Sequence, residues 1–268
     1  MRVNSLSTNY LSGCYRKLGF RWLMWSLCIC TCICLDTLEA VPLIMNEQSS
    51  ITVSYFVVNS LLFGGQFLPY FGFVFASGLI ASENCRERLG GISRYLVGRM
   101  GIKRYTAVRA IYTYTGAASI STAGMLMFCS AAMCFQPFYS RTLDPEMCGF
   151  PYFAALSHGN GLWYLVIVLY LLALSGIFYA AIAMVCDAAF GNVYVTSASP
   201  LLASYLITRV LVLFHLPHEL RFDLWLRARC VYHSEGMTLF LCTLIVIVAA
   251  VVCWRIYYRQ MCKQFEGE

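Results

Sequence analysis

The sequence predicts an all-α fold, a polytopic transmembrane helix bundle with six spans and both termini in the cytoplasm. Three observations predict this class. Of the 268 residues, 60% are hydrophobic and only 12% are charged, whereas a soluble domain carries about 25% charged residues. Six apolar segments recur along the chain, and the basic residues gather between alternate segments. A chain of this composition cannot cover a surface that faces water on all sides.

The lengths of the apolar segments support the count of spans. A transmembrane helix needs about 20 apolar residues, within a range of about 17–25. Four segments meet this length easily, and the last of them contains the uncharged run CTLIVIVAAVVCW. The first apolar run is short at residues 22–35, with a possible continuation to 45, and the short fifth segment carries Arg209 in its middle. The predicted spans are residues 22–45, 51–81, 110–135, 161–186, 200–216 and 236–254.

The basic residues lie mainly on one side of this predicted bundle. With a cytoplasmic N-terminus, the cytoplasmic stretches hold 14 Lys and Arg against 5 Asp and Glu, and the opposite side holds 4 against 8. This bias follows the positive-inside rule, and it requires the fifth segment to span. The prediction is a basic N-terminus (1–21), a membrane domain (22–254) and a cytoplasmic tail (255–268). The net charge of +6 therefore reflects membrane orientation rather than a nucleic-acid partner, and membrane lipids are the expected partners.

The first apolar segment has two interpretations. A basic stretch, a short apolar run and then polar residues describe either an uncleaved first helix or a cleaved secretory signal peptide. The run LCICTCICLD (27–36) contains four cysteines spaced two apart. On a helix, residues two apart point about 200° away from each other, so Cys28 and Cys32 share one face while Cys30 and Cys34 share another. The four thiols then cannot meet at one metal ion, and neither a metal nor a cofactor is predicted.

Four cysteines are candidates for covalent modification. Cys28 lies nearest the cytoplasmic surface, and Cys262 lies beside basic residues in the tail, so both are candidate palmitoylation sites. Cys148 and Cys230 lie in two loops on the non-cytoplasmic side. A disulfide between these two loops is the prediction for an oxidising lumen.

Arg209 is the one basic residue that the topology leaves inside a span. A central arginine costs about 2.5–3.5 kcal/mol on insertion scales. One interpretation is a buried polar site, for which Asp36, Glu39 and Asp187 are the candidate partners. The other is an arginine that extends toward the interface from a short, tilted helix.

The third segment, YTYTGAASISTAGMLMF, carries small residues four apart. Such faces allow helix backbones to approach closely in lipid. They predict a helix-packing face in preference to a pore lining. The pairs are Ala117 with Ser121, Ala118 with Thr122, and Ser119 with Ala123.

Polar residues lie at the non-cytoplasmic ends of the fourth and sixth segments. His158 and Asn160 lie in ALSHGNGLWYL, and His233 and Glu235 lie in CVYHSEGMTLF. A histidine near a carboxylate suits acid–base work or binding of a lipid headgroup. The alternative is that these residues cap two helix starts at the membrane interface. All four are candidates for a lumenal polar site.

The stretches HGNGLWYL and CVYHSEGMTLF, together with six spans and a basic loop between the second and third, resemble one family. It is the family of post-GPI attachment to proteins factor 2 and the DRAM autophagy modulators. The residues that carry the resemblance are His158, Asn160, Cys230, Glu235, Gly236, Thr238 and Phe240. It implies a Golgi or endoplasmic reticulum protein, and a non-catalytic factor in GPI-anchor lipid remodelling or in the maturation and transport of GPI-anchored proteins. GPI-anchored or other membrane proteins are then its partners.

Two other functions remain as alternatives. In the first, the chain is a lipid-modifying enzyme in which His158 and Glu235 converge on a headgroup. In the second, it is a channel, a receptor or a viral-type multipass protein that acts through partner helices. The resemblance implies no catalytic residue, so an enzyme is the less favoured class.

Overall fold

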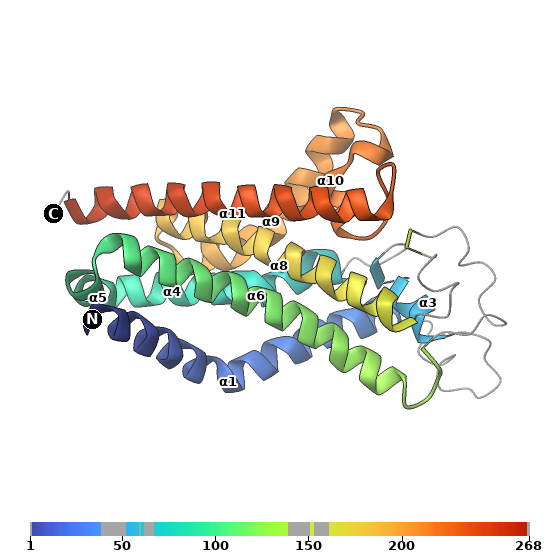
Figure 1. Cartoon of the computed structure of the whole chain (residues 1–268), viewed down its shortest axis with the longest axis horizontal. Helices are drawn as coiled ribbons and strands as arrows, with labels where there is room; N and C mark the ends of the chain where they lie inside the picture. Colours follow the sequence, from blue (N-terminus) through green and yellow to red (C-terminus); the bar gives the residue numbers. More distant parts are fainter. Residues whose placement is uncertain are drawn as a thin grey trace.

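The computed structural model of the chain is a bundle of long helices aligned along one axis, with both termini at the same end (Figure 1). It describes residues 2–38, 52–58, 60–61, 67–138, 151–152 and 161–266. All regular elements in this part of the chain are helical, which confirms the predicted all-α class.

Among the described residues, five helices are long and apolar enough to cross a membrane, as expected of a multi-pass membrane protein. They correspond to the first, third, fourth, fifth and sixth predicted segments. The first span is Leu18–Asp36, the C-terminal part of its helix. Residues 39–45 of the predicted span lie outside the described residues. The five helices are α1 (Arg2–Asp36), α6 (Ile102–Ala132), α8 (Gly161–Phe190), α9 (Val193–Leu213) and α11 (Glu235–Glu266).

The predicted second span is divided among several elements. These are α3 (Val53–Val58), the π-helices η2 (Phe67–Gly72) and η3 (Val74–Gly78), and α4 (Leu79–Leu89). The chain is helical without a break over residues 67–89. Asp36, at the end of α1, accepts hydrogen bonds from the backbone amides of Phe67 (2.9 Å) and Leu68 (2.8 Å). These amides have no partner inside their own helix, so the Asp36 carboxylate caps this stretch.

Short helices close the bundle at both ends. At the end that holds the termini, α5 (Ile92–Met100) joins α4 to α6. At the opposite end, η5 (His218–Leu220) and α10 (Phe222–Leu226) form the connection between α9 and α11. The Phe222 ring packs edge-on against Phe178 of α8 at 5.3 Å, which fixes this connection to the bundle.

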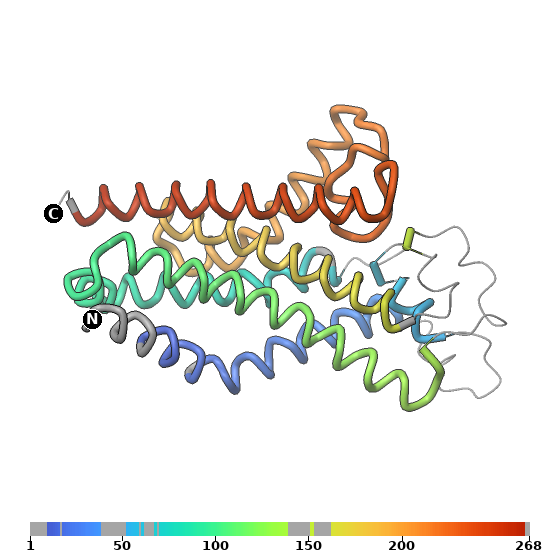
Figure 2. Tube along the Cα trace, in the orientation of Figure 1, coloured from blue at the N-terminus to red at the C-terminus, as the bar shows by residue number. Residues whose placement is uncertain are grey.

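Helix α6 lies between α1 and α8, as the trace in Figure 2 shows. A Cβ atom on Gly124 of α6 would lie only 2.6 Å from the Cβ of Ile29 in α1. A Cβ on Gly176 of α8 would lie 2.9 Å from the carbonyl oxygen of Ala117 and 2.8 Å from Oγ of Ser121. Ala117 and Ser121 belong to the predicted small-residue face of α6, so the prediction of a packing face is confirmed.

The helices differ in how much of their apolar surface the bundle covers. In α8, 61% of the apolar window is buried, whereas in α9 and α11 only 22% is buried. In a bilayer such uncovered apolar faces contact lipid chains rather than water. Helix α8 is therefore the centre of the bundle, and α9 and α11 lie at its periphery.

Candidate functional site

A polar cavity of about 330 Å³ lies between α1, α4 and α6. These helices converge there near the end of the bundle where both termini lie. Three arginines and two glutamates line the cavity, so its formal charge is +1 (3 − 2). The lining residues are Cys14, Arg21, Glu83, Arg86, Glu87, Arg109 and Tyr112.

Arg109 of α6 is the most enclosed charge in this cavity, with only 1% of its side chain exposed. Its guanidinium forms an ion pair with Glu87 of α4. Burying a charge is costly unless the charge is paired, so this pair ties α6 to α4. Rings from Tyr10, Tyr105 and Tyr112 lie 5.1, 5.8 and 5.9 Å from the guanidinium carbon, and cation–π attraction adds to the stabilisation.

Tyr10 of α1 brings a third helix to the same carboxylate. Its hydroxyl donates a hydrogen bond to Oε2 of Glu87 at 2.8 Å. Burial raises the pKa of the Tyr10 phenol above its ordinary value, although the nearby Arg109 opposes this shift. Tyr10 therefore remains a proton donor at neutral pH, and Glu87 serves as the shared acceptor.

Glu83 lies one helical turn before Glu87 on the same face of α4. It accepts a hydrogen bond from the Tyr112 hydroxyl of α6 at 3.1 Å and forms an ion pair with Arg21 of α1. The Arg21 side chain is 56% exposed, whereas Arg109 is almost fully enclosed. The cavity therefore has a buried end at Arg109 and an open end near Arg21 and the exposed Arg86.

A second ion pair lies next to the cavity on the other face of α4. Arg88 contacts Asp187 of α8 at 3.0 Å, and the side chain of Asp187 is completely buried. Arg88 also donates to Oε1 of Gln264 in α11 at 3.1 Å, and Gln264 donates to the carbonyl oxygen of Ala188 at 3.0 Å. These contacts join α4, α8 and α11. The end of the bundle that holds the termini is thus crosslinked by charged groups.

The arrangement of charges in the cavity is suited to holding a polar ligand. Arginine binds phosphate through a planar fork of N–H donors. The surplus cation and the exposed Arg86 leave positive charge at the open end, while Glu83 and Glu87 offer acceptors for an amine or hydroxyl group. A headgroup that carries both a phosphate and a donor group matches this lining.

The predicted outer site is described only in part. Glu235 begins α11 and is half-buried, and His233 is exposed with its ring 4.4 Å from that of Tyr232. His158 and Asn160 lie outside the described residues. The convergence of these two polar clusters therefore stays a prediction.

Residues of CVYHSEGMTLF, the second stretch that carries the family resemblance, form the start of α11. The Thr238 hydroxyl accepts from the Tyr232 amide at 2.8 Å and lies 2.8 Å from the Ser234 carbonyl oxygen, to which it donates. Ser234 in turn accepts from the Met237 amide at 3.3 Å. These bonds satisfy groups at the helix N-terminus. This geometry agrees with the alternative that polar residues of this stretch cap a helix start.

Arg209 has an exposed side chain, and its guanidinium lies 5.1 Å from the ring of Tyr205, one turn earlier on α9. Two of its predicted partners have other contacts, since Asp187 pairs with Arg88 and Asp36 caps η2. Glu39 lies outside the described residues. Of the two interpretations, the structure agrees with the arginine that extends from the bundle.

The candidate modification sites have different surroundings. The run 27–36 is continuous α-helix, so the four cysteines of LCICTCICLD are divided between two faces as predicted. Cys28 and Cys262 are both half-buried, and their palmitoylation stays a prediction. Cys230 is half-buried, and burial raises the pKa of its thiol. Cys148, its predicted disulfide partner, lies outside the described residues.

A group of arginines lies on the opposite end of the bundle, around α10. Arg221 forms an ion pair with Asp223 at 2.8 Å. Arg229 donates to the carbonyl oxygen of Leu61 at 3.1 Å, and burial followed by the proximity of Arg227 lowers its pKa. Arginine stays charged in proteins, so two neighbouring cations repel each other here.

Sequence reasoning missed the cavity around Arg109. The predicted third span began at residue 110, whereas α6 begins at Ile102, so Arg109 lies two turns inside a helix rather than in a loop. The spacing of Glu83 and Glu87, four apart behind an apolar run, indicates one helix face. That spacing is the sequence signal from which a buried charged face of this helix could have been predicted.

A scan against protein-family models, a search of curated proteins and a search of solved structures give no match to this chain.

Proposed function

We propose that the chain is a non-catalytic multi-pass membrane protein that binds a phospholipid headgroup in the cavity lined by Glu83, Glu87 and Arg109. The observation that carries this proposal is the paired but positively biased lining, closed at Arg109 and open at Arg86. A phosphate would pair with the surplus cation, and the carboxylates would accept hydrogen bonds from a headgroup amine or hydroxyl.

The proposal includes six spans with cytoplasmic termini. Five crossings would place the two termini on opposite sides, whereas both termini lie at one end of the bundle (Figure 1). The unbroken helical stretch 67–89 is the candidate for the additional crossing. Its apolar part is residues 67–82, and Glu83, Arg86 and Glu87 then lie at the cytoplasmic surface. The open cavity then faces the cytoplasmic leaflet.

Short-chain phospholipids test the headgroup site. The purified full chain in neutral detergent is heated with dihexanoyl phosphatidylserine, or with dihexanoylglycerol, which lacks the phosphate headgroup. We expect the phospholipid alone to raise the unfolding temperature and Arg86→Ala to reduce that rise. Arg99→Ala is the matched control, because Arg99 is exposed but stacks on Tyr95 at 4.3 Å, outside the cavity. Equal effects of the two additives, or equal effects of the two variants, would contradict the proposal.

A more specific second proposal is a role in GPI-anchor lipid remodelling in the Golgi or endoplasmic reticulum. It is favoured by the resemblance at the starts of the fourth and sixth predicted spans. The adjacent Arg227 and Arg229 at the outer end also favour it, because the phosphate of a GPI anchor would relieve their repulsion. Gene deletion in the source cell is the test. We expect GPI-anchored proteins at the cell surface to fall or to change their lipid moiety; unchanged levels and unchanged lipid composition would contradict the role.

A further inference from the structure

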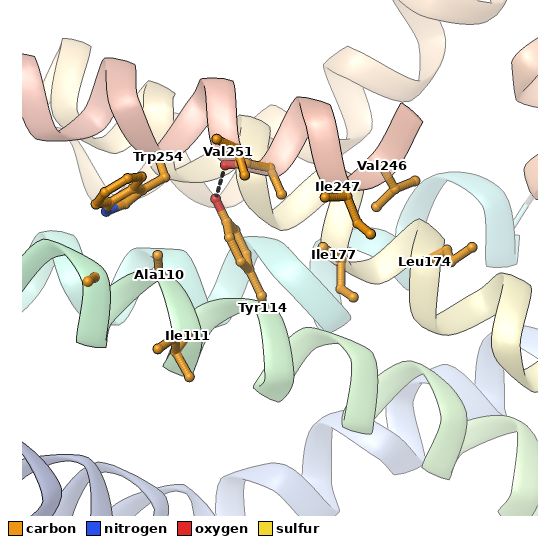
Figure 3. Close-up of a pocket in the computed structure, with 11 residues that line it drawn as sticks. Ala110, Ile111, Tyr114, Leu174, Ile177, Val246, Ile247, Val251 and Trp254 are labelled. Atoms are coloured by element: carbon orange, nitrogen blue, oxygen red, sulfur yellow. Dashed lines mark hydrogen bonds between the residues drawn. The ribbon is translucent and has the colours of Figure 1, made fainter. Parts of the chain in front are cut away.

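An apolar groove of about 420 Å³ runs between α6, α8 and α11, on a different face of α6 from the cavity. Figure 3 shows Ala110 and Tyr114 of α6 directed toward Val251 and Trp254 of α11, and Ile111 also lines the groove. The side chains of Ile111 and Val251 are exposed. The groove therefore opens toward the surrounding bilayer rather than into the bundle.

Tyr114 crosses the groove and fixes its width. Its hydroxyl donates to the carbonyl oxygen of Ala250 in α11 at 3.0 Å (Figure 3). That carbonyl oxygen lies inside a regular helix, where it also accepts a backbone hydrogen bond. The bond holds α6 and α11 in place while leaving apolar surface uncovered on either side of the ring.

The indole of Trp254 lies at the end of the groove nearest the termini (Figures 1 and 3). Its Nε1–H is buried and has no hydrogen-bond acceptor among the residues that the structure describes. A buried donor without an acceptor costs about 1–3 kcal/mol. Tryptophan is also the residue typical of the membrane interface, where an apolar ring meets polar headgroups. The ring of Trp254 thus marks the level at which lipid headgroups meet the apolar groove.

The charge around this end of the groove is positive on both helices. Lys103 lies one helical turn before the lining residue Ala107 on α6, and Arg255 follows Trp254 on α11. Both side chains are exposed. The chain contains no Asp or Glu over residues 92–110 or 236–265. Each Lys or Arg near a membrane surface contributes about 1 kcal/mol to the attraction of anionic lipid.

The length of the groove matches one acyl chain in one leaflet. Val246 and Trp254, at its two ends on α11, are eight residues apart, which is about 12 Å along a helix. One leaflet contributes about 15 Å of the roughly 30 Å hydrocarbon core. The apolar groove, the interfacial ring of Trp254 and the basic rim thus follow the order of parts in a phospholipid, from the chain to the ester region to the headgroup.

We propose that the groove binds one acyl chain of an anionic phospholipid, whose headgroup lies against Lys103 and Arg255 at the level of the Trp254 ring. This site is separate from the headgroup cavity proposed above, because no lining residue is shared. Failure of one proposal therefore leaves the other standing.

Fluorescence quenching tests this site. The full chain is placed in phosphatidylcholine nanodiscs that contain increasing small fractions of phosphatidylserine with brominated acyl chains. Bromine quenches tryptophan on contact. We expect a saturable quenching component at low phosphatidylserine fraction, and Trp254→Phe should remove it. Brominated phosphatidylcholine should give only gradual, non-saturable quenching.

Three further variants make the test specific. The double variant K103E/R255E should shift the midpoint of the saturable component by more than about tenfold. Ala107→Phe should abolish the component by filling the groove, and Leu202→Phe, on the exposed face of α9, should leave it unchanged. Should A107F fail to fold, the exposed K103E/R255E pair still decides the matter. Identical curves for the two brominated lipids, or an unshifted midpoint in K103E/R255E, would overturn the proposal, as would crosslinking that places a second copy in the groove.

Discussion

Arg109 of α6 and Glu87 of α4 form an ion pair in which the two partners differ in enclosure. The arginine side chain is 1% exposed and the glutamate side chain is 21% exposed. Each would therefore respond differently to losing its partner. An isolated Glu87 can gain water from the cavity, whereas an isolated Arg109 cannot.

This asymmetry predicts the order of two substitutions. Glu87→Gln leaves a buried, uncompensated guanidinium and should destabilise the protein by about 3 kcal/mol or more. Arg109→Met removes the buried charge itself and should cost less. Thermal unfolding of both variants in the same detergent measures the difference. If R109M unfolds at a lower temperature than E87Q, Arg109 stabilises the bundle by something other than this pair.

The ion pair of Arg21 with Glu83 provides the exposed counterpart. The Arg21 side chain is 56% exposed, and pairs of this kind contribute about 0–1 kcal/mol because water and salt screen them. Arg21→Ala should therefore change the unfolding temperature little. Arg88→Ala, which leaves the fully buried Asp187 unpaired, should lower it strongly. If both variants lower the unfolding temperature by similar amounts, exposure does not determine how much each ion pair stabilises the protein.

The close approach of α8 to α6 at Gly176 predicts a steric cost for alanine. The added methyl group would lie 2.9 Å from the Ala117 carbonyl oxygen, and overpacking of this kind typically costs about 1–3 kcal/mol. Gly98→Ala in α5 is the control, because no atom lies within 4 Å of a Cβ at that position. G98A should be neutral or stabilising by up to about 1 kcal/mol. Equal unfolding temperatures for G176A and G98A would refute the close contact.

The thiol of Cys230 should react slowly with maleimide at neutral pH. Burial raises its pKa, so less of the reactive thiolate is present, and its alkylation should accelerate as the pH rises. Cys134, which is exposed at the end of α6, is the comparison. Mass spectrometry of peptides after brief alkylation gives both rates. If Cys230 becomes reactive only after reduction, it forms a disulfide, as the predicted pairing with Cys148 requires; alkylation of Cys230 as rapid as that of Cys134 without reductant would exclude both the burial effect and the disulfide.

The helical class and the small-residue face of α6 could be predicted because both depend on patterns along the chain. Composition excludes a soluble surface, and a four-residue spacing defines a helix face whatever its partner is. The cavity depends instead on side chains far apart in sequence. Glu83 and Tyr112 meet only because α4 and α6 are antiparallel neighbours, joined through α5. Arg209 interrupts an apolar run and is therefore conspicuous in the sequence, whereas Arg109 directly precedes one, as a loop residue would.

The fate of the first segment is the last prediction. The residues of α1 beyond the basic stretch pack into the bundle, where Ile29 and Ile33 are buried and Gly124 of α6 leaves room for Ile29. Cleavage near residue 37 would release α1 and remove this close packing, which is what drives helix association in lipid. We therefore expect the segment to remain attached as the first helix. A tag at the N-terminus should stay on the full-length protein in immunoblots. It should be accessible, like a tag at the C-terminus, when only the plasma membrane is permeabilised; a tag lost with a shortened chain would establish the signal-peptide alternative.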